Sequence, residues 1–125
     1  MSKLILLIDD DVDEFHIFSM AVAMIEGDYQ PVYAANVQQA MQLIAEKVPA
    51  CIFVDANMPR QDGLSCVAHI RKLAHLDQVP VIVYSTRADE YLCKLAIAAG
   101  ANDCVRKQDT LQRISDSLRQ ILQRV

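Results

Sequence analysis

Tryptophan is absent from this 125-residue sequence, which contains only three phenylalanines and four tyrosines. Its hydrophobic fraction of 53% is therefore mostly aliphatic and is too high for a disordered chain. No apolar run is long enough to cross a bilayer, and nothing resembles a signal peptide. We expect a single domain with an aliphatic core, located in the cytoplasm and without membrane contact.

The sequence also lacks basic clusters and nucleotide-binding loops. The formal net charge is −4, and no basic run alternates with aromatic residues, which disfavours direct nucleic-acid binding. Neither GxGxxG nor a Walker A motif occurs. The acids of residues 9–13 superficially match the start of an EF-hand loop. Glu14 and Met20, however, stand where that loop needs a glycine and a glutamate, so we exclude an EF-hand.

Cysteine motifs are missing as well. The four cysteines are Cys51, Cys66, Cys93 and Cys104. None forms a CxxC pair, and no histidine stands at zinc-ligand spacing from them. Cys51 lies in an apolar run, where a thiol behaves as a small hydrophobic side chain. Because cytoplasmic thiols are kept reduced, we predict four free thiols.

Short apolar runs alternate with helical patterns from one end of the chain to the other. The predicted strands are residues 4–8, 31–35, 51–54, 81–84 and 104–105, and the predicted helices are residues 12–25, 37–48, 64–73, 89–99 and 111–125. This alternation predicts an α/β domain, a parallel sheet covered by helices on both faces.

Capping signals support several of these boundaries. Asn36 with Gln39 fits a capping box, and Asp109 with Gln112 is a second candidate. Gly100 is placed as the glycine that ends a helix.

Acidic residues follow two of the predicted strands. Asp9 and Asp10 come directly after the first strand, and Asp55 follows the third. Because the carboxyl ends of parallel strands meet at one edge of a sheet, we expect these side chains to converge. Adjacent carboxylates repel one another, and a bound Mg²⁺ relieves the repulsion. We interpret Asp9 and Asp10 as metal ligands, whereas Asp11 and Asp13 suit the start of a helix.

Asp55, taken singly, is either a turn aspartate or a nucleophile that forms an aspartyl-phosphate. Ser85 and Thr86 end the fourth strand, and Lys107 follows the fifth. Each alone is an ordinary hydroxyl or surface lysine. Together they supply what phosphoryl transfer requires, because a cation and an ammonium neutralise phosphoryl oxygens and a hydroxyl donates to one of them.

Six motifs occur in order along the chain: Ile8–Asp11, Val54–Pro59, Asp62–Gly63, Ser85–Thr86, Gly100–Asp103 and Lys107. Their order and spacing resemble the receiver domain of two-component response regulators over the whole chain. The resemblance implies a flavodoxin-like (βα)5 fold, with a five-stranded parallel sheet in the order 2-1-3-4-5. We expect residues 1–125 to form a single receiver domain without an output domain.

The resemblance assigns a role to each acidic site residue. Asp55 is the phosphoacceptor, which takes a phosphoryl group from a histidine kinase or a histidine phosphotransfer protein. Asp9, Asp10 and Asp55, with the backbone carbonyl of Asn57, hold Mg²⁺.

The resemblance also assigns the switch. Ser85, Thr86 and Lys107 bind the phosphoryl group, and Ser85 is the hydroxyl that turns toward it. Asn57 and Arg87 occupy positions that tune dephosphorylation.

A protein of this kind is a signalling protein and not an enzyme, because only its own aspartate is phosphorylated and dephosphorylated. The resemblance implies that an unknown downstream protein binds the face formed by the fourth helix, the fifth strand and the fifth helix. We expect a monomer or a weak phosphorylation-dependent dimer.

Other functions remain as alternatives. A degenerate receiver would be a phosphorylation-independent interaction module. A Mg²⁺-dependent phosphohydrolase is the less favoured alternative, because Val12 and Asp13 replace the Gly-Thr of the haloacid-dehalogenase pattern. A flavodoxin-type electron carrier is disfavoured by the missing tryptophan and phosphate-cradling loop.

Two positions depart from the family pattern. Gln108 follows Lys107 where the family usually has proline, often after a cis bond. Because a non-proline cis bond costs about 2.5–4 kcal/mol, we expect either a trans bond with a rearranged loop or a strained cis bond. Cys104 replaces an aromatic residue whose rotation reports phosphorylation. We therefore expect the signal to travel through the segment after Ser85 and the fourth helix.

Overall fold

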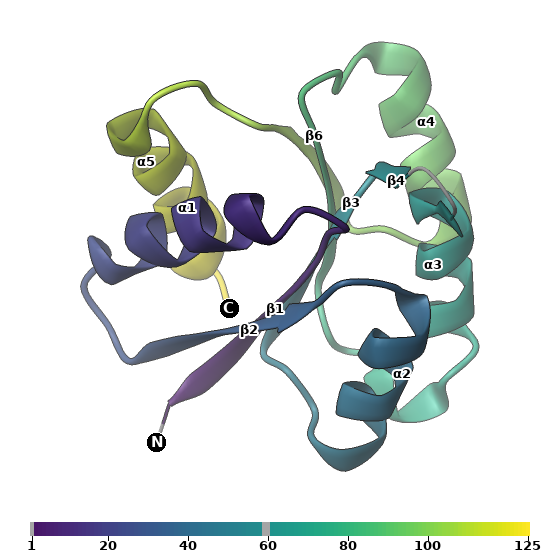
Figure 1. The fold of residues 1–125 in the computed structure, drawn as a ribbon. Coiled ribbons are helices and arrows are strands. Elements are labelled where there is room, and N and C mark those ends of the chain that lie inside the picture. Colours follow the sequence, from purple (N-terminus) through teal and green to yellow (C-terminus); the bar gives the residue numbers. More distant parts are fainter. Residues whose placement is uncertain (1, 59–60) are drawn as a thin grey trace.

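A parallel sheet of five strands forms the centre of the computed structural model, which describes residues 2–58 and 61–125 (Figure 1). The strands are β1 (Lys3–Ile8), β2 (Tyr29–Ala34), β3 (Cys51–Asp55), β6 (Val81–Ser85) and β7 (Asp103–Arg106). The helices are α1 (Val12–Ala23), α2 (Val37–Glu46), α3 (Gly63–Arg71), α4 (Glu90–Ala99) and α5 (Leu111–Leu122), with a 3-10 turn η1 (Ala74–Leu76). The strand order β2-β1-β3-β6-β7 is the predicted 2-1-3-4-5 arrangement.

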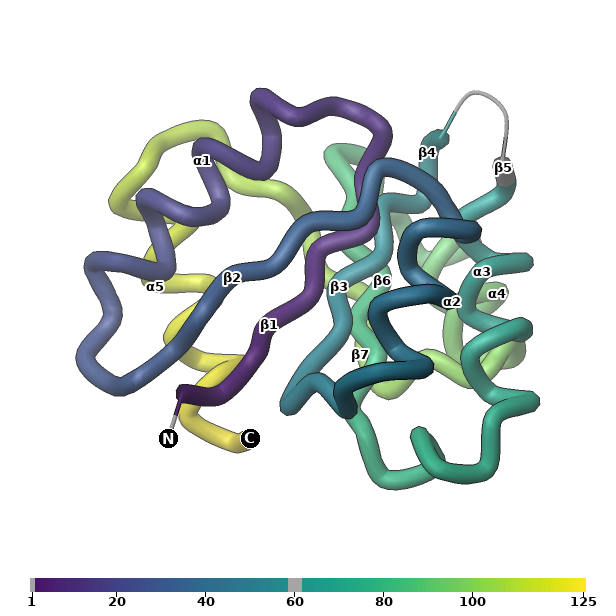
Figure 2. Tube along the Cα trace, turned by 60° about the horizontal axis from the view of Figure 1, so that its bottom comes forward, coloured from purple at the N-terminus to yellow at the C-terminus, as the bar shows by residue number. Residues whose placement is uncertain are grey.

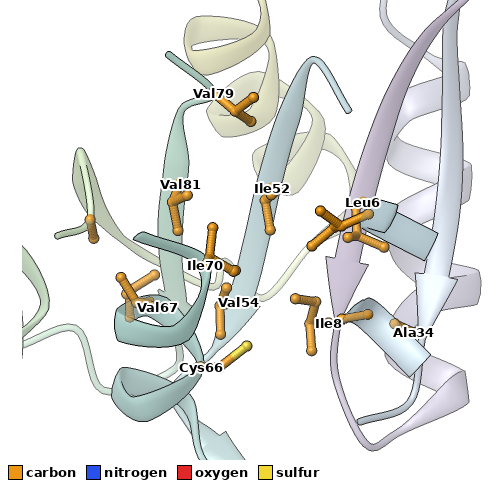
Figure 3. Packing of buried hydrophobic residues seen from close by; sticks show 14 of the residues in the cluster. Leu6, Ile8, Ala34, Ile52, Val54, Cys66, Val67, Ile70, Val79 and Val81 are labelled. Atoms are coloured by element: carbon orange, nitrogen blue, oxygen red, sulfur yellow. The ribbon is translucent and has the colours of Figure 1, made fainter. Parts of the chain in front are cut away.

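Helices cover both faces of this sheet, as the alternation of elements predicted. Helices α1 and α5 lie on one face, and α2, α3 and α4 lie on the other (Figure 1). All five residues of β3 are buried, because each side of a parallel strand faces a helix layer. Val67 and Ile70 of α3 point toward the strand residues Ile52, Val54 and Val81 in Figure 3. The core is mainly aliphatic.

The opposite face carries a small aromatic group. The rings of Phe18 in α1 and Phe53 in β3 meet edge to face with their centroids 5.3 Å apart. Tyr84 of β6 lies 5.8 Å from Phe53 in the same manner. Edge-to-face packing of this kind adds to the stabilisation from burial, and here it packs α1 against β3 and β6.

The helices begin within one residue of the predicted positions, whereas α1, α2, α3 and α5 end two or three residues earlier than predicted. Asp11 caps α1, since its carboxylate accepts from the Asp13 amide at 2.9 Å. Asn36 caps α2 by accepting from the Gln39 amide at 2.8 Å. The Gln39 side chain reaches back to the residue 35 amide, one position before the predicted one. Gly100 ends α4 with a φ of 116°, a conformation that glycine adopts without strain.

The predicted capping box at Asp109 and Gln112 is wrong. Thr110 caps α5 instead, accepting from the Arg113 amide at 3.2 Å. Gln112 donates forward along the helix to Asp116 at 3.0 Å, and Asp109 pairs with the Arg113 guanidinium. The helix begins one residue later than the capping box required, so Gln112 points away from its cap.

A short antiparallel pair follows β3 where the sequence indicated only a turn-rich loop. Strand β4 (Asn57–Met58) pairs with β5 (Gln61–Asp62). The Asp62 side chain then caps α3 by accepting from the Leu64 amide at 3.0 Å. Pro59 of the predicted motif lies outside the described residues.

The prediction of four free thiols is wrong for one pair of cysteines. Cys93 in α4 and Cys104 in β7 form a disulfide, with their Cα atoms 5.3 Å apart. They come together because α4 packs against β7, a tertiary contact that their spacing of 11 residues does not reveal. Cys51 and Cys66 are free, as predicted, and both are buried.

The start of β1 lies beside the carboxyl-terminal end of the chain (Figure 2). The Lys3 ammonium donates to the Val125 carbonyl oxygen at 2.8 Å. Among the described residues, no helix has both the length and the apolar character needed to span a membrane.

Candidate phosphoryl-transfer site

Three carboxylates converge at the carboxyl ends of β1 and β3. These strands are neighbours in the sheet. Asp9 and Asp10, which directly follow β1, therefore lie beside Asp55, the last residue of β3. One carboxylate oxygen from each of the three lies within 4.8 Å of the others. Asp9 and Asp55 are only 1% and 6% exposed, whereas Asp10 is open to solvent. The predicted convergence of these acids is confirmed.

Lys107 supplies a single ammonium to this acidic cluster. Its Nζ lies 3.0 Å from Asp9 Oδ2, 3.6 Å from Asp55 Oδ1 and 3.9 Å from Glu14 Oε2. The lysine side chain is 10% exposed and also passes over the ring of Tyr84 at 5.5 Å. Burial on this scale makes the charge interactions stronger than they are at a protein surface.

The charges in this cluster shift the pKa values of its members. Burial raises the pKa of the Asp55 carboxyl group, the ammonium of Lys107 partly offsets this rise, and the charge of Asp9 adds to it. Burial by itself lowers the pKa of Lys107. The carboxylates around it, Asp55 first and then Asp9, outweigh burial, so that its pKa is raised. The ammonium of Lys107 therefore stays charged.

Ser85 lies at the end of β6 with its side chain fully buried. Its Oγ accepts from the Arg87 amide at 3.1 Å and from the Asn57 side-chain amide at 3.4 Å. The Lys107 amide donates to the Ser85 carbonyl oxygen at 2.8 Å, which joins the ends of β6 and β7. The hydroxyl is thus held by the loop after β3 and by the loop after β6.

The loop after β3 is fixed around Asp55. The Asn57 amide donates to Asp55 Oδ1 at 3.2 Å. A Cβ atom at Gly63 would collide with the Asp55 carbonyl oxygen, so only glycine permits α3 to start this close to the strand end. The backbone thereby sets the direction of the Asp55 carboxylate.

Two predicted residues lie farther from the acids. Thr86 is exposed and lines a cleft of about 310 Å³ beside Lys107, together with Glu14 and Met20. The Arg87 side chain is 83% exposed, and its guanidinium lies 3.7 Å from the Asp89 carboxylate. Only the backbone amide of Arg87 contacts the site, through Ser85.

The peptide bond between Lys107 and Gln108 is trans, like the others among the described residues. Of the two geometries predicted for this bond, the strained cis form is therefore excluded.

Known proteins resemble the chain over nearly its whole length. A family profile described as the response regulator receiver domain matches residues 5–119. The chain belongs to this family. It is 34% identical over 122 residues to the transcriptional regulatory protein KdpE of Staphylococcus aureus, covering 97% of this chain and 50% of that protein. It is 25% identical over 114 residues to a probable chemotaxis protein CheY of Rhizobium etli, covering 91% of this chain and 88% of that protein.

The fold of the receiver domain is equally clear. The structure of chemotaxis protein CheY4 from Vibrio cholerae superimposes with a TM-score of 0.86 and 22% sequence identity, covering 100% of this chain and 99% of that one. The chain spans about half the length of the first curated relatives that it matches. It is a receiver domain of two-component response regulators, a class of signalling proteins that are phosphorylated on aspartate and are generally not enzymes.

Receiver domains bind Mg²⁺ at an acidic pocket, and the residues of this chain suit that ion. Mg²⁺ prefers hard oxygen ligands, and three carboxylates offer them here with only one ammonium to balance their charge. The two buried acids, Asp9 and Asp55, are the ones that a bound cation would relieve most, because their repulsion is least screened.

Sequence reasoning missed two neighbours of Lys107. Glu14 comes one helical turn after the capping residue Asp11, a spacing that points it to the same side as the strand end. Tyr84 precedes Ser85, and its ring packs on the face of the sheet covered by α1 and α5, 5.5 Å from the Lys107 ammonium. The acidic first turn of α1 was a usable signal for Glu14, whereas the sequence held none for Tyr84.

Proposed function

We propose that Asp55 accepts a phosphoryl group from the phosphohistidine of a histidine kinase or histidine phosphotransfer protein, in a reaction that depends on Mg²⁺. One observation carries the proposal. The buried carboxylate of Asp55 lies 3.6 Å from the Lys107 ammonium and shares its pocket with Asp9 and Asp10. The pocket therefore contains both a nucleophile and the charged groups needed to bind a metal ion and neutralise a phosphoryl group.

In the proposed transfer, an Asp55 carboxylate oxygen attacks the phosphorus atom of the donor. A P–O bond forms while the P–N bond to the donor imidazole breaks, and the bonding electron pair stays on that nitrogen. Lys107 is already charged and within reach, so it stabilises the negative charge on the phosphoryl oxygens. The amide of Asn57, which donates to Asp55 Oδ1, holds the carboxylate in place.

Asp9, Asp10 and Asp55 would hold the metal, together with the backbone carbonyl of Asn57. Bound Mg²⁺ supplies charge neutralisation between the Asp55 carboxylate and the incoming phosphoryl group. Asp9 has a second task, because it also accepts from Lys107 at 3.0 Å and so orients the ammonium.

Ser85 is the proposed switch. Its hydroxyl oxygen now accepts from Arg87 and Asn57 and can turn to donate to a phosphoryl group on Asp55. That turn gives up the hydrogen bond from Arg87, so the segment 86–89 moves with it. Thr86 lines the adjoining cleft and contributes to phosphate binding from there. Asn57 and Arg87 tune the lifetime of the aspartyl-phosphate.

The moved segment leads directly into α4. We propose that a downstream protein in the cytoplasm reads the face formed by α4, β7 and α5. Tyr91 and Leu95 lie four residues apart on α4 and are 74% and 39% exposed, so this face offers apolar contacts.

Incubation with acetyl phosphate and Mg²⁺, followed by intact-mass measurement, tests the assignment of Asp55. We expect one added phosphoryl group on the wild type and none on Asp55→Asn. Phosphoramidate, which carries the P–N bond of phosphohistidine, should serve as a second donor. Asp77→Asn is the matched control, because Asp77 is exposed and precedes β6 at the end of the sheet away from the pocket. It should be phosphorylated like the wild type.

The same experiment separates the alternatives. Wild-type protein that stays unmodified across a range of Mg²⁺ and donor concentrations would show a degenerate receiver. Steady release of phosphate from a phosphate ester, abolished by Asp9→Asn and not by Asp55→Asn, would show a phosphohydrolase.

A further inference from the structure

The disulfide between Cys93 and Cys104 joins two elements on the route from the pocket to the proposed readout face. Cys93 lies in the first turn of α4, and Cys104 lies in β7, three residues before Lys107. Both side chains are half-buried and therefore reachable by small thiols and disulfides. By contrast, Cys51 and Cys66 are 0% exposed, and burial raises the pKa of each thiol to about 12.

The far end of α4 is held by other means. The Arg71 guanidinium donates to the Gly100 carbonyl oxygen at 2.8 Å and to Asn102 Oδ1 at 2.7 Å. Asn102 in turn accepts from the Val81 amide at 2.8 Å, so this end of the helix is tied to α3 and β6. The carboxyl end of α4 is therefore fixed whatever the state of the cysteines.

The first turn of α4 has few other attachments. Within α4, which is described throughout, Ala96 alone is buried. Leu92 packs partly against the core, and Asp89 caps the helix without bonding to the sheet. The disulfide is thus the strongest restraint that holds the first turn against β7.

This first turn is also where movement from the pocket arrives. Ser85 ends β6, and the segment 86–89 connects it to α4. Because the Arg87 amide bonds to Ser85 Oγ, a turn of that hydroxyl displaces the segment. The next residue of the chain that is covalently tied to the sheet is Cys93.

We propose that Cys93 and Cys104 are a reversible thiol–disulfide modification site that sets the mobility of the first turn of α4. The oxidised pair holds this turn against β7, and the reduced pair releases it while Arg71 keeps the other end fixed. The consequence for signalling rests on the proposed function. The phosphorylated state reaches the α4 face only when the pair is reduced.

The chemistry is thiol–disulfide exchange with a low-molecular-weight disulfide. The thiolate of one cysteine attacks a donor sulfur, forms a mixed disulfide and releases one donor thiol. The second cysteine thiolate then attacks the first cysteine sulfur and releases the other donor thiol. Two electrons and two protons pass from the pair to the donor. In a cytoplasm that keeps thiols reduced, a disulfide of this kind forms transiently, as redox-sensing disulfides do.

Thiol counting tests the site itself. The full chain is equilibrated with reduced and oxidised glutathione at several ratios and then labelled under native conditions with N-ethylmaleimide. The intact mass of the labelled protein gives the number of free thiols. We expect two labels at the reducing end, on Cys93 and Cys104, and none at the oxidising end. Cys51 and Cys66 should stay unlabelled throughout. Labelling that does not change with the glutathione ratio would overturn the proposal.

Amide hydrogen exchange tests the restraint, first without any phosphoryl donor. Reduction should speed exchange in the first turn of α4 by about tenfold or more while leaving α5 unchanged. Cys93→Ser should exchange as the reduced protein does under both conditions, and Cys51→Ala should respond to reduction as the wild type does. Equal exchange in the oxidised and reduced wild type would overturn the proposal, whether or not Asp55 is phosphorylated.

The final arm adds acetyl phosphate and Mg²⁺, with intact mass recorded in parallel. We expect equal phosphorylation in both redox states but a change of exchange in residues 86–95 only in the reduced protein. Absence of phosphorylation in both the oxidised and the reduced protein would contradict the proposed function of Asp55. The proposal for Cys93 and Cys104 would then be decided by the hydrogen-exchange comparison without a phosphoryl donor. If the oxidised and reduced proteins were phosphorylated equally and showed equal changes of hydrogen exchange in residues 86–95, the proposed control of α4 by the disulfide would be overturned.

Discussion

The ammonium of Lys107 lies 3.0 Å from a carboxylate oxygen of Asp9, and both side chains are nearly removed from solvent. This pair links the ends of β1 and β7, which lie on opposite sides of β3 in the sheet. It therefore spans the strand that carries Asp55. Among residues 2–58 and 61–125, Lys107 is the cation that pairs with these buried carboxylates and offsets their charge.

Replacing Lys107 should destabilise the metal-free protein. In Lys107→Ala, Asp9 and Asp55 lose their counter-charge while remaining buried, so we expect the free energy of unfolding to fall by about 3 kcal/mol. Saturating Mg²⁺ should recover much of this loss, because the ion replaces the missing positive charge. Urea denaturation with EDTA and with Mg²⁺ measures both effects. Lys94→Ala removes an exposed pair with Glu90 and should change stability by at most about 0.5 kcal/mol.

The raised pKa of Asp55 predicts how stability depends on pH. Folding raises this pKa, so the folded protein holds the proton more tightly than the unfolded chain. The contribution of Asp55 is therefore most favourable below the ordinary aspartate pKa of about 3.9 and is lost as the pH rises through the raised value.

Asp55→Asn removes the free-energy cost of burying the ionised Asp55 carboxylate. In EDTA, the variant should be more stable than the wild type, by a margin that is wider at about pH 7.5 than at about pH 5. Denaturation midpoints at the two values of pH measure the margin. Mg²⁺ should stabilise the wild type more than the variant and so narrow the gap. A margin that shrinks as the pH rises would contradict the direction of the shift.

Gly63 should not tolerate a side chain. A Cβ atom there would meet the Asp55 carbonyl oxygen and the Ala56 Cα, so Gly63→Ala must push α3 away from the end of β3. We expect a loss of about 1–3 kcal/mol in stability, with weaker Mg²⁺ binding because the Asp55 carboxylate shifts. Calorimetric titration with Mg²⁺ reports the second effect. Ser65→Ala, at an exposed site in the same helix, should change stability by at most about 0.5 kcal/mol and leave Mg²⁺ affinity unaltered.

Arg71 should contribute more to stability than an ordinary surface arginine. Its guanidinium makes four hydrogen bonds, to the carbonyls of Gly100, Leu76 and Val79 and to Asn102. Arg71→Ala should lower the free energy of unfolding by about 3 kcal/mol. Arg71→Lys should recover little of this, because an ammonium cannot reproduce the planar fork of donors. Thermal unfolding, with Arg113→Ala as an exposed control, decides whether these contacts act as described.

Much of the fold followed from local patterns in the sequence. Buried parallel strands are continuous apolar runs in the sequence, such as Cys51–Val54, and the polar residue that follows such a run, here Asp55, marks the strand end. Because the carboxyl ends of parallel strands meet at one edge of a sheet, the convergence of Asp9 and Asp55 could be predicted as well. The resemblance to a known family added the strand order, which periodicity alone does not supply.

The features that could not be predicted depend on tertiary contacts. The disulfide requires the first turn of α4 to face β7, and nothing between Cys93 and Cys104 encodes that orientation. The sequence pattern indicated only that Arg71 belongs to an amphipathic helix. Its four hydrogen-bond partners lie later in the sequence and reach Arg71 only in the folded structure. The start of α5 at Leu111 was predicted correctly, but its capping residue was misplaced by one position because Asp109 and Thr110 are both good capping residues.

The contact between Lys3 and Val125 has a practical consequence. Strand β1 separates this contact from Asp9 by about 20 Å, since six strand residues rise about 3.3 Å each. A short linker could therefore join the two termini and leave the acidic pocket undisturbed, with new ends opened in an exposed connection such as residues 26–28. Circular permutants of this design would carry fluorescent reporters close to a chosen helix, which would turn the domain into a sensor of its own phosphorylation.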